Sequence, residues 1–199
     1  MDSRRPEPIG VVLAGGLGRR MGGAKATVLL RGRPLISYPL GALSAALAEV
    51  VVLAKAETEL PGLPGTTVWI ESHPMHHPAI GILEALALAG GRSVLVCAAD
   101  LPFVSPGLVR KLVSTAAEGA TAAVAAAQGR VQPLLGCYQP AAARLLRAGD
   151  ERPVREQVAD LDPRIVEVED PRELFNVNAP EDLLQASAAL ERRWTSSRR

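Results

Sequence analysis

The chain has 199 residues, of which 48% are hydrophobic and only 3% aromatic, and this length is enough for one domain with a complete core. Its 22 basic and 21 acidic residues leave a formal net charge of +1, which argues against a general nucleic-acid binder. The first residues are polar and no apolar run is long enough to cross a bilayer. We therefore expect a cytoplasmic protein with no membrane or nucleic-acid partner.

The first predicted strand, residues 9–13, leads directly into a glycine-rich loop. Its apolar run is typical of a buried parallel strand. The loop combines five glycines with three basic residues, which are Gly15, Gly16, Gly18, Gly22, Gly23, Arg19, Arg20 and Lys25. Glycines allow backbone amides to face an anion, and the cations add to that attraction. The loop therefore predicts a binding site for a nucleoside triphosphate, with a glycine-rich turn bearing solvated arginines as the structural alternative.

Two commoner phosphate-binding loops do not fit this stretch. A Walker loop has Ser or Thr directly after its lysine, whereas Ala26 follows Lys25. A dinucleotide fingerprint needs a third glycine where Met21 stands and an acid at the end of the second strand. That strand ends in Ala54 and Lys55 instead.

Strand-like and helical stretches alternate along the rest of the chain. Strands are expected over residues 50–54, 66–70, 93–98, 121–126, 134–138 and 165–168. Helices are expected over residues 34–47, 80–89, 105–117, 140–147, 154–161 and 180–193. This order predicts an α/β fold of three α/β/α layers around a mostly parallel, doubly wound sheet. We expect one domain over residues 9–193, with a flexible N-terminus over residues 1–8 and a flexible basic tail over residues 194–199.

Asp100 is the strongest candidate site residue after the loop, because only Ala99 separates it from the apolar strand predicted over residues 93–98. The carboxyl ends of parallel strands meet at one edge of a sheet, so its carboxylate should lie beside the glycine loop. Magnesium prefers one or two carboxylates together with phosphate oxygens and waters. The alternative is that Asp100 caps the next helix, a position that Ser105 already fills.

Two later stretches carry weaker signals. Asn176 and Asn178 alternate, which places both amides on one side of an extended segment, although Asn178 is equally suited to cap the last helix. His73, His76 and His77 raise the question of a zinc site, but their spacing is loose and no cysteine is near. A solvated loop is the better interpretation of the histidines.

Three ordered motifs resemble those of the MobA-like molybdenum cofactor guanylyltransferases. Residues 13–25 are similar to the pattern L-A-G-G-x-x-x-R-M-G-x-x-K, residues 98–103 to A-x-D-x-P-F, and residues 176–183 to N-x-N-[TS]-P-E-[DE]-L. The chain departs from the family at Ala24, where most members have Asp, and at Leu53, where many have Asn.

The resemblance implies the fold of the nucleotide-diphospho-sugar transferases and transfer of GMP from GTP to the terminal phosphate of Mo-molybdopterin, with Mg²⁺ as cofactor. It implies catalytic roles for Lys25, Asp100 and Arg20, with Asp100 as the metal ligand. The nucleotide-binding residues it implies are Leu13, Ala14, Gly15, Gly16, Gly18, Lys25, Glu71, Gly81 and Asp100. The molybdopterin-binding residues it implies are Arg19, Asn176 and Asn178. Expected partners are GTP, molybdopterin and, transiently, proteins that deliver molybdopterin or act as chaperones of molybdoenzymes.

Two kinds of alternative stay open. The first is a related nucleotidyltransferase, which would use CTP with the same pterin or would act on a sugar phosphate or phospholactate. The second, suggested by Ala24 and Leu53, is a GTP-binding paralogue without catalytic activity. A basic wall for the second phosphorylated substrate is expected from Arg130, Gln132, Pro133, Arg152 and Arg155.

Overall fold

A computed structural model describes residues 6–15 and 26–196, with side chains up to residue 191. Its elements in chain order are β1 (Ile9–Leu13), β2 (Leu29–Leu30), β3 (Arg33–Pro34), α1 (Ser37–Ser44), β4 (Val50–Ala54), β5 (Thr67–Ile70), α2 (Pro78–Leu88), β6 (Val94–Ala98), α3 (Pro106–Ala117), β7 (Ala122–Ala127), β8 (Arg130–Tyr138), the 3₁₀ turn η2 (Pro140–Arg144), α4 (Val154–Ala159), β9 (Arg164–Glu167), the 3₁₀ turn η3 (Pro171–Leu174) and α5 (Pro180–Ser196). No helix of this described part has the length and apolarity needed to span a bilayer.

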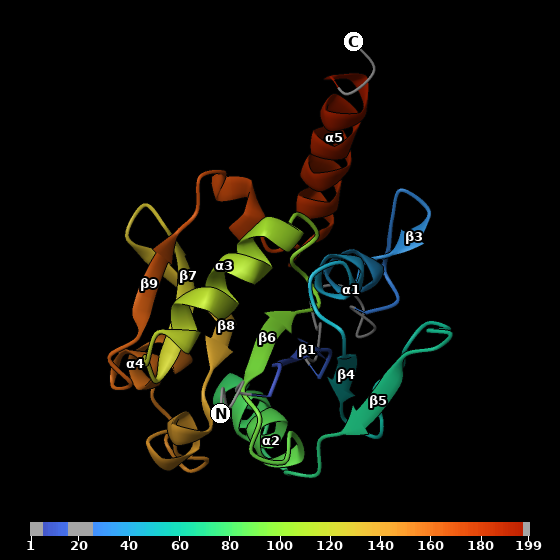
Figure 1. The fold of residues 1–199 in the computed structure, drawn as a ribbon. Helices are drawn as coiled ribbons and strands as arrows, with labels where there is room; N and C mark the ends of the chain where they lie inside the picture. The colour runs from blue at the N-terminus through green and yellow to red at the C-terminus, as the bar shows by residue number, and fades with distance from the viewer. Residues whose placement is uncertain (1–5, 16–25, 197–199) are drawn as a thin grey trace.

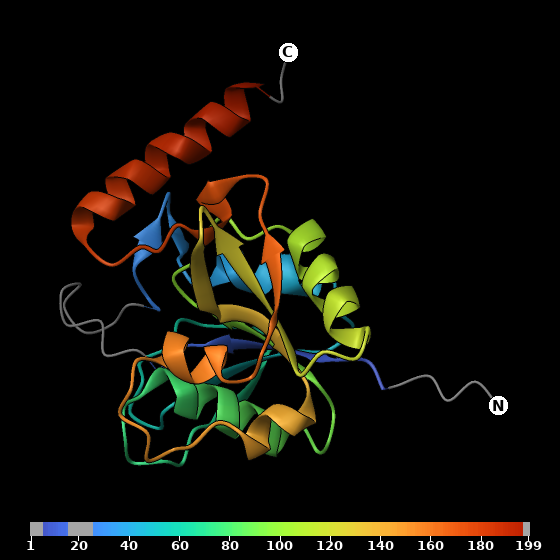
Figure 2. The ribbon, with the colours of Figure 1, turned by 90° about the vertical axis from the view of Figure 1, so that its left-hand side faces the viewer.

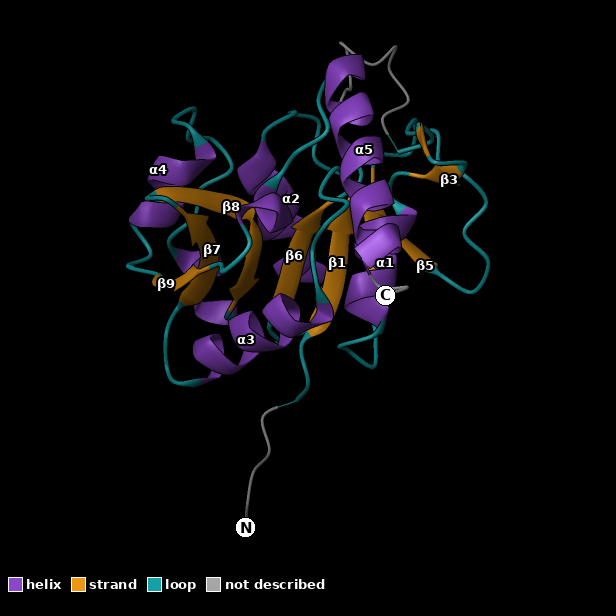
Figure 3. Cartoon of the chain, turned by 90° about the horizontal axis from the view of Figure 1, so that it is seen from above, coloured by secondary structure: helices purple, strands orange, loops and turns teal. Residues whose placement is uncertain are grey.

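A seven-stranded sheet with the strand order β5-β4-β1-β6-β8-β7-β9 forms the centre of the molecule (Figures 1 and 3). The strands from β5 to β6 are parallel, and β9 is parallel to β7. β8 runs antiparallel to both of its neighbours. It does so because Gln128 and Gly129, with φ of 52° and 73°, turn the chain tightly between β7 and β8. The prediction of a mostly parallel sheet is confirmed.

Helices cover both faces of this sheet, because successive strand residues point to opposite sides. Val12 packs with residues of α1 and α3 on one face. Val11 packs with residues of α2, η2 and α4 on the other. Figure 2 shows these helices as two layers with the strands between them. The predicted three-layer architecture is confirmed.

A third, smaller hydrophobic cluster packs α5 against β2 and the loops that follow β3 and β6, and not against the seven-stranded sheet. Its buried members are Leu30, Leu35, Phe103, Val177, Ala186 and Ala189. Phe103 and Phe175 meet edge to face, with ring centroids 6.1 Å apart. The outer part of α5 extends away from the sheet (Figure 1).

Most predicted helices begin within two residues of those observed, and two differ in their start or in their type. The helix predicted over residues 34–47 is α1, which begins only at Ser37, because Arg33–Pro34 pairs with Leu29–Leu30 in an antiparallel hairpin. Arg31 and Gly32 take the left-handed φ values of 51° and 77° that such a tight turn requires. The helix predicted over residues 140–147 is the short 3₁₀ turn η2.

Candidate functional site

A cavity of about 250 Å³ lies at the carboxyl ends of the parallel strands. Four adjacent strands each supply a residue that follows the strand end and lines this cavity. Glu71 comes after β5, Lys55 after β4, Gly15 after β1 and Asp100 after β6. The residues implied for nucleotide binding that the structure describes, Leu13, Ala14, Gly15, Glu71, Gly81 and Asp100, therefore all line one cavity.

The glycine-rich loop begins and ends at this cavity. Gly15 and Ala26, the residues that flank the segment 16–25, both line it. The amide of Ala14 donates to the carbonyl of Leu53 at 2.9 Å and so continues the sheet to the cavity edge. The candidate residues Gly16, Gly18, Arg19, Arg20 and Lys25 lie outside the described residues.

Lys55 and Glu71 form a nearly buried ion pair in the cavity wall. The Lys55 ammonium lies 2.9 Å from Glu71 Oε1, and the two side chains are 7% and 9% exposed. Lys55 Nζ also donates to the carbonyl of His73 at 2.6 Å. A Cβ on Gly15 would lie 3.4 Å from Glu71 Oε2, so the glycine keeps that carboxylate edge uncovered by a side chain.

Sequence reasoning missed Lys55 as a site residue. Its signal was available, because Lys55 directly follows the apolar strand β4, and Asp100 comes two residues after the end of β6. The same edge rule that selected Asp100 applies to it.

The N-terminus of α2 packs closely against the end of β1. A Cβ on Gly81 would lie 3.1 Å from Leu13 Cδ1, so glycine permits this approach. His77 Nδ1 accepts a hydrogen bond from the amide of Ala79 at 3.2 Å, and Nε2 lies 3.1 Å from the carbonyl of Arg152. With these partners, Nδ1 is the acceptor and Nε2 is the donor. His77 therefore caps α2 at the cavity edge.

Asp100 is 9% exposed and is held by the segment that precedes α5. Asn176 Nδ2 donates to Asp100 Oδ1 at 3.0 Å. The amide of Val177 donates to the backbone carbonyl of Asp100 at 3.0 Å. Ser105 caps α3 by accepting from the amide of Leu108 at 3.1 Å, so this helix is capped without Asp100, which lines the cavity.

The two candidate asparagines are placed differently. Asn176 contacts Asp100, whereas Asn178 is exposed. At the start of α5 the carboxylate of Asp182 accepts from the amides of Asn178 and Ala179 at 2.8 and 2.9 Å. An acid three residues into a helix often reaches back in this way. The structure thus brings one of the two asparagines to the cavity region through Asp100.

Two members of the expected basic wall, Arg152 and Gln132, have partners within the protein. Arg152 pairs with the carboxylates of Asp150 and Asp160 at 2.7 and 2.8 Å. Hydrogen bonds from Arg152 lower the pKa of Asp150, and its carboxylate neighbours raise the pKa of Arg152. Gln132 is bonded to Asn176 rather than exposed as part of a wall.

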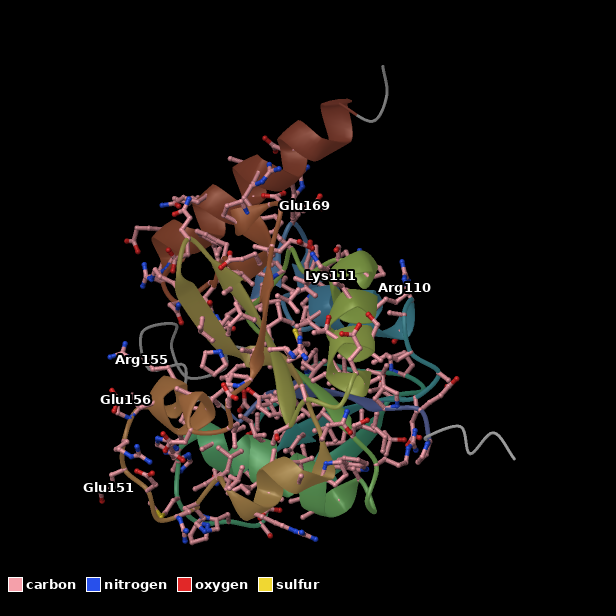
Figure 4. All side chains as sticks on the ribbon, turned by 60° about the vertical axis from the view of Figure 1, so that its left-hand side comes forward. Arg110, Lys111, Glu151, Arg155, Glu156 and Glu169 are labelled. Carbon is pink, nitrogen blue, oxygen red and sulfur yellow. The ribbon has the colours of Figure 1, made fainter. Side chains whose placement is uncertain are left out.

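The helix α4 adds no basic surface facing the sheet. Its Arg155 lies 3.9 Å from the carboxylate of Glu156. Figure 4 shows both side chains on the outer side of α4, directed away from the sheet. The charge of Arg155 is therefore offset locally as well.

Among the described residues that line the cavity, Asp100 could hold a magnesium ion. Asp100 supplies a hard carboxylate oxygen, which Mg²⁺ combines with substrate phosphates and waters. Zinc is bound by several clustered His or Cys ligands. Among the described residues, no three or more His, Cys, Asp or Glu side chains come together as a metal site.

Comparison with known proteins is consistent with this geometry. Residues 10–168 match the family of the MobA-like NTP transferase domain. A molybdenum cofactor guanylyltransferase of Cereibacter sphaeroides is 37% identical over 92% of this chain and 97% of its own length. Another from Rhizobium leguminosarum bv. trifolii is 32% identical over 94% and 95%. The crystal structure of molybdopterin-guanine dinucleotide biosynthesis protein A from Archaeoglobus fulgidus is similar, with a TM-score of 0.76 and 26% identity over 92% of this chain and 99% of that one.

Proposed function

Because this chain belongs to the MobA-like NTP transferase family, we propose that it transfers GMP from GTP to the terminal phosphate of Mo-molybdopterin. An oxygen of the pterin phosphate attacks the α-phosphorus of GTP, the bond to the β-phosphate breaks, and pyrophosphate leaves. The proposal depends on one observation above all, that the ends of the glycine loop and the Asp100 carboxylate line one cavity. No protein nucleophile is needed.

The Lys55–Glu71 pair supports guanine as the base. The Watson–Crick edge of guanine presents two N–H donors, at N2 and N1, followed by the acceptor O6. A carboxylate can accept from both donors, and an ammonium can donate to O6. Glu71 and Lys55 offer these groups side by side, 2.9 Å apart, in the cavity wall. Cytosine would bring its acceptor N3 toward the carboxylate, so the same pair disfavours CTP.

The phosphate end of the proposed site is Asp100 together with the loop. Bound at Asp100, Mg²⁺ would neutralise charge on the α-phosphate and on the leaving pyrophosphate. The chain itself holds the reactants in line, a role we assign to the loop amides with Lys25 and Arg20. Asn176 keeps the Asp100 carboxylate oriented toward the cavity. We assign the acceptor phosphate to Arg19, Asn176 and Asn178, of which Asn176 contacts Asp100.

GTP and molybdopterin are the substrates, and the protein acts in the cytoplasm. Proteins that deliver molybdopterin or act as chaperones of molybdoenzymes are its transient partners.

Pyrophosphate release tests the proposal. The protein is incubated with Mg²⁺ and either GTP or CTP, with and without Mo-molybdopterin. We expect release only with GTP and the pterin together. Asp100→Ala should abolish release while GTP binding is retained, and the exposed Asp160→Ala serves as its control. Preference for CTP would indicate a cytidylyltransferase, and GTP binding without release for any acceptor would indicate a non-catalytic paralogue.

A further inference from the structure

Two carboxamides in series connect the backbone of β8 to Asp100. The amide of Leu134 donates to Gln132 Oε1 at 3.4 Å. Gln132 Nε2 then donates to Asn176 Oδ1 at 2.7 Å, and Asn176 Nδ2 donates to Asp100 Oδ1 at 3.0 Å. We call this chain of hydrogen bonds the amide relay.

The relay has only one consistent direction. A carboxamide carries its donor and its acceptor at opposite ends, so either residue could in principle be turned around. The backbone N–H of Leu134 can only donate, and an ionised Asp100 carboxylate can only accept. With these two ends set, Gln132 must present its oxygen to Leu134, and Asn176 must present its N–H to Asp100.

A break in the strand pairing aims Gln132 at this site. Val124 of β7 pairs with Gly136, but the next residue, Ala125, pairs with Gln132. Residues 133–135 of β8 therefore lie between two consecutive pairings, as in a β-bulge, a feature that re-aims side chains beside active sites. The hydroxyl of the fully buried Tyr138 donates to the carbonyl of Pro133 at 2.5 Å and holds this bulge.

We propose that Gln132 is a positioning residue for the Asp100 metal site, acting through Asn176. This inference rests on the function proposed above. In this role Gln132 contacts neither the nucleotide nor the cation. Its N–H fixes Asn176 so that an N–H, and not a carbonyl oxygen, faces the ligating carboxylate. Outer partners of this kind typically change metal affinity by about 10–100-fold.

The variant Gln132→Glu separates this role from simple electrostatics. A glutamate at this position has the same shape and can still accept from Leu134, but it cannot donate to Asn176. The relay therefore predicts weaker cation binding. Electrostatics alone predicts the reverse, because an added carboxylate near a cation site should strengthen binding.

The measurement is the affinity for Mn²⁺, a spectroscopic substitute for Mg²⁺, in the presence of a non-hydrolysable GTP analogue. We expect Gln132→Glu to weaken Mn²⁺ binding by about 10–100-fold, with metal-free binding of the analogue unchanged. The matched control is Gln139→Glu, since Gln139 Nε2 is also a hydrogen-bond donor, in its case to the backbone carbonyl of Ala116 at 3.2 Å, and Gln139 does not line the cavity. Gln139→Glu should lower the melting temperature about as much as Gln132→Glu does, but it should leave the Mn²⁺ affinity equal to that of the wild type.

A double-mutant cycle tests the connection through Asn176. In an Asn176→Leu background, Gln132→Glu should no longer weaken Mn²⁺ binding, because the intermediate carboxamide is gone. Unchanged or tighter Mn²⁺ binding by Gln132→Glu in the wild-type background would overturn the relay alone. A wild-type protein that binds neither Mn²⁺ nor the analogue would overturn the proposed function together with it.

Discussion

Lys55 and Glu71 show how single residues can carry both stability and selectivity. Each side chain is more than nine-tenths buried, and removing a charged group from water is costly unless a partner compensates it. In the ion pair, each charge compensates the other for the loss of water. It also leaves an acceptor and a donor together in the wall of the cavity.

Lys55→Met should therefore destabilise the fold and reduce the discrimination between GTP and CTP. Loss of the ammonium leaves the Glu71 carboxylate buried without its partner, which typically costs about 3–5 kcal/mol. Urea denaturation measures this change. Glu191→Gln breaks the exposed Arg31–Glu191 pair, with side chains 40% and 64% exposed, and should cost less than about 1 kcal/mol. Equal effects of the two substitutions would contradict the role of burial.

The site residues that sequence could predict are those set by strand position. Asp100 was predictable because a residue just beyond the end of a buried parallel strand lies at the ligand edge of the sheet. The partner of Asp100 was not, because Asn176 reaches it through a contact between segments 76 positions apart. Gln132 was assigned to a basic wall because its contact with Asn176 also joins segments that are far apart in the sequence. The hydrogen bonds of Gln132 depend on the bulge in β8, and the residue pattern of that strand does not indicate a bulge.

At the level of elements, the β7–β8 pairing leaves no room beside the bulge. A Cβ on Gly136 would lie 2.8 Å from Val124 Cγ1 and 2.9 Å from the carbonyl oxygen of Ala123. The second of these atoms belongs to the backbone and cannot turn aside. This glycine is therefore required by the close approach of the two strands.

Gly136→Ala should destabilise the protein by about 1–3 kcal/mol, as overpacking in a core does. Gly41→Ala is the matched comparison, because Gly41 lies exposed in α1 with nothing within 4 Å of its added Cβ. That change should stabilise the protein by about 0.5–1 kcal/mol, since alanine favours a helix over glycine. Thermal unfolding of both variants gives the comparison, and a neutral Gly136→Ala would mean that the strands separate easily.

Elements with strong patterns were predicted well, and short ones were not. The apolar runs gave the bounds of β1 and β4, and Ser105 correctly marked the start of α3. The β2–β3 hairpin was missed because each strand has two residues, too few to show an alternating pattern. Pro34 was taken as a helix start, a position that proline often occupies.

For the molecule as a whole, the two cysteines report on global unfolding. Both are free and fully buried in the central strands β6 and β8. Burial raises the pKa of Cys137 to about 12. Burial, and to a smaller extent the charge of Asp100, also raises the pKa of Cys97. Since the thiolate is the reactive form, the folded protein should hold both thiols inert.

Alkylation near pH 8 should therefore modify neither cysteine in the native protein and both in concentrated urea. The raised pKa values also predict pH dependence. The buried thiols contribute to the free energy of unfolding, and this contribution is fully present below the unfolded pKa of about 9. As the pH rises toward 12, the free energy of unfolding should fall by about 1.4 kcal/mol per pH unit for each thiol. Denaturant midpoints between these pH values measure it. Rapid modification of the native protein would show that β6 and β8 open locally.

The small cluster beneath α5 has a consequence for how the reactive parts are aligned. Leu30 lies just beyond the end of the glycine loop, Phe103 just beyond Asp100, and Val177 next to Asn176. Three stretches that are remote in the sequence thus pack in one hydrophobic cluster, which Ala186 and Ala189 of the last helix complete. That helix lines none of the cavity formed by the described residues. Truncating the chain before α5 should nevertheless release all three stretches from their fixed positions. We therefore expect turnover to be lost although α5 itself contacts no substrate.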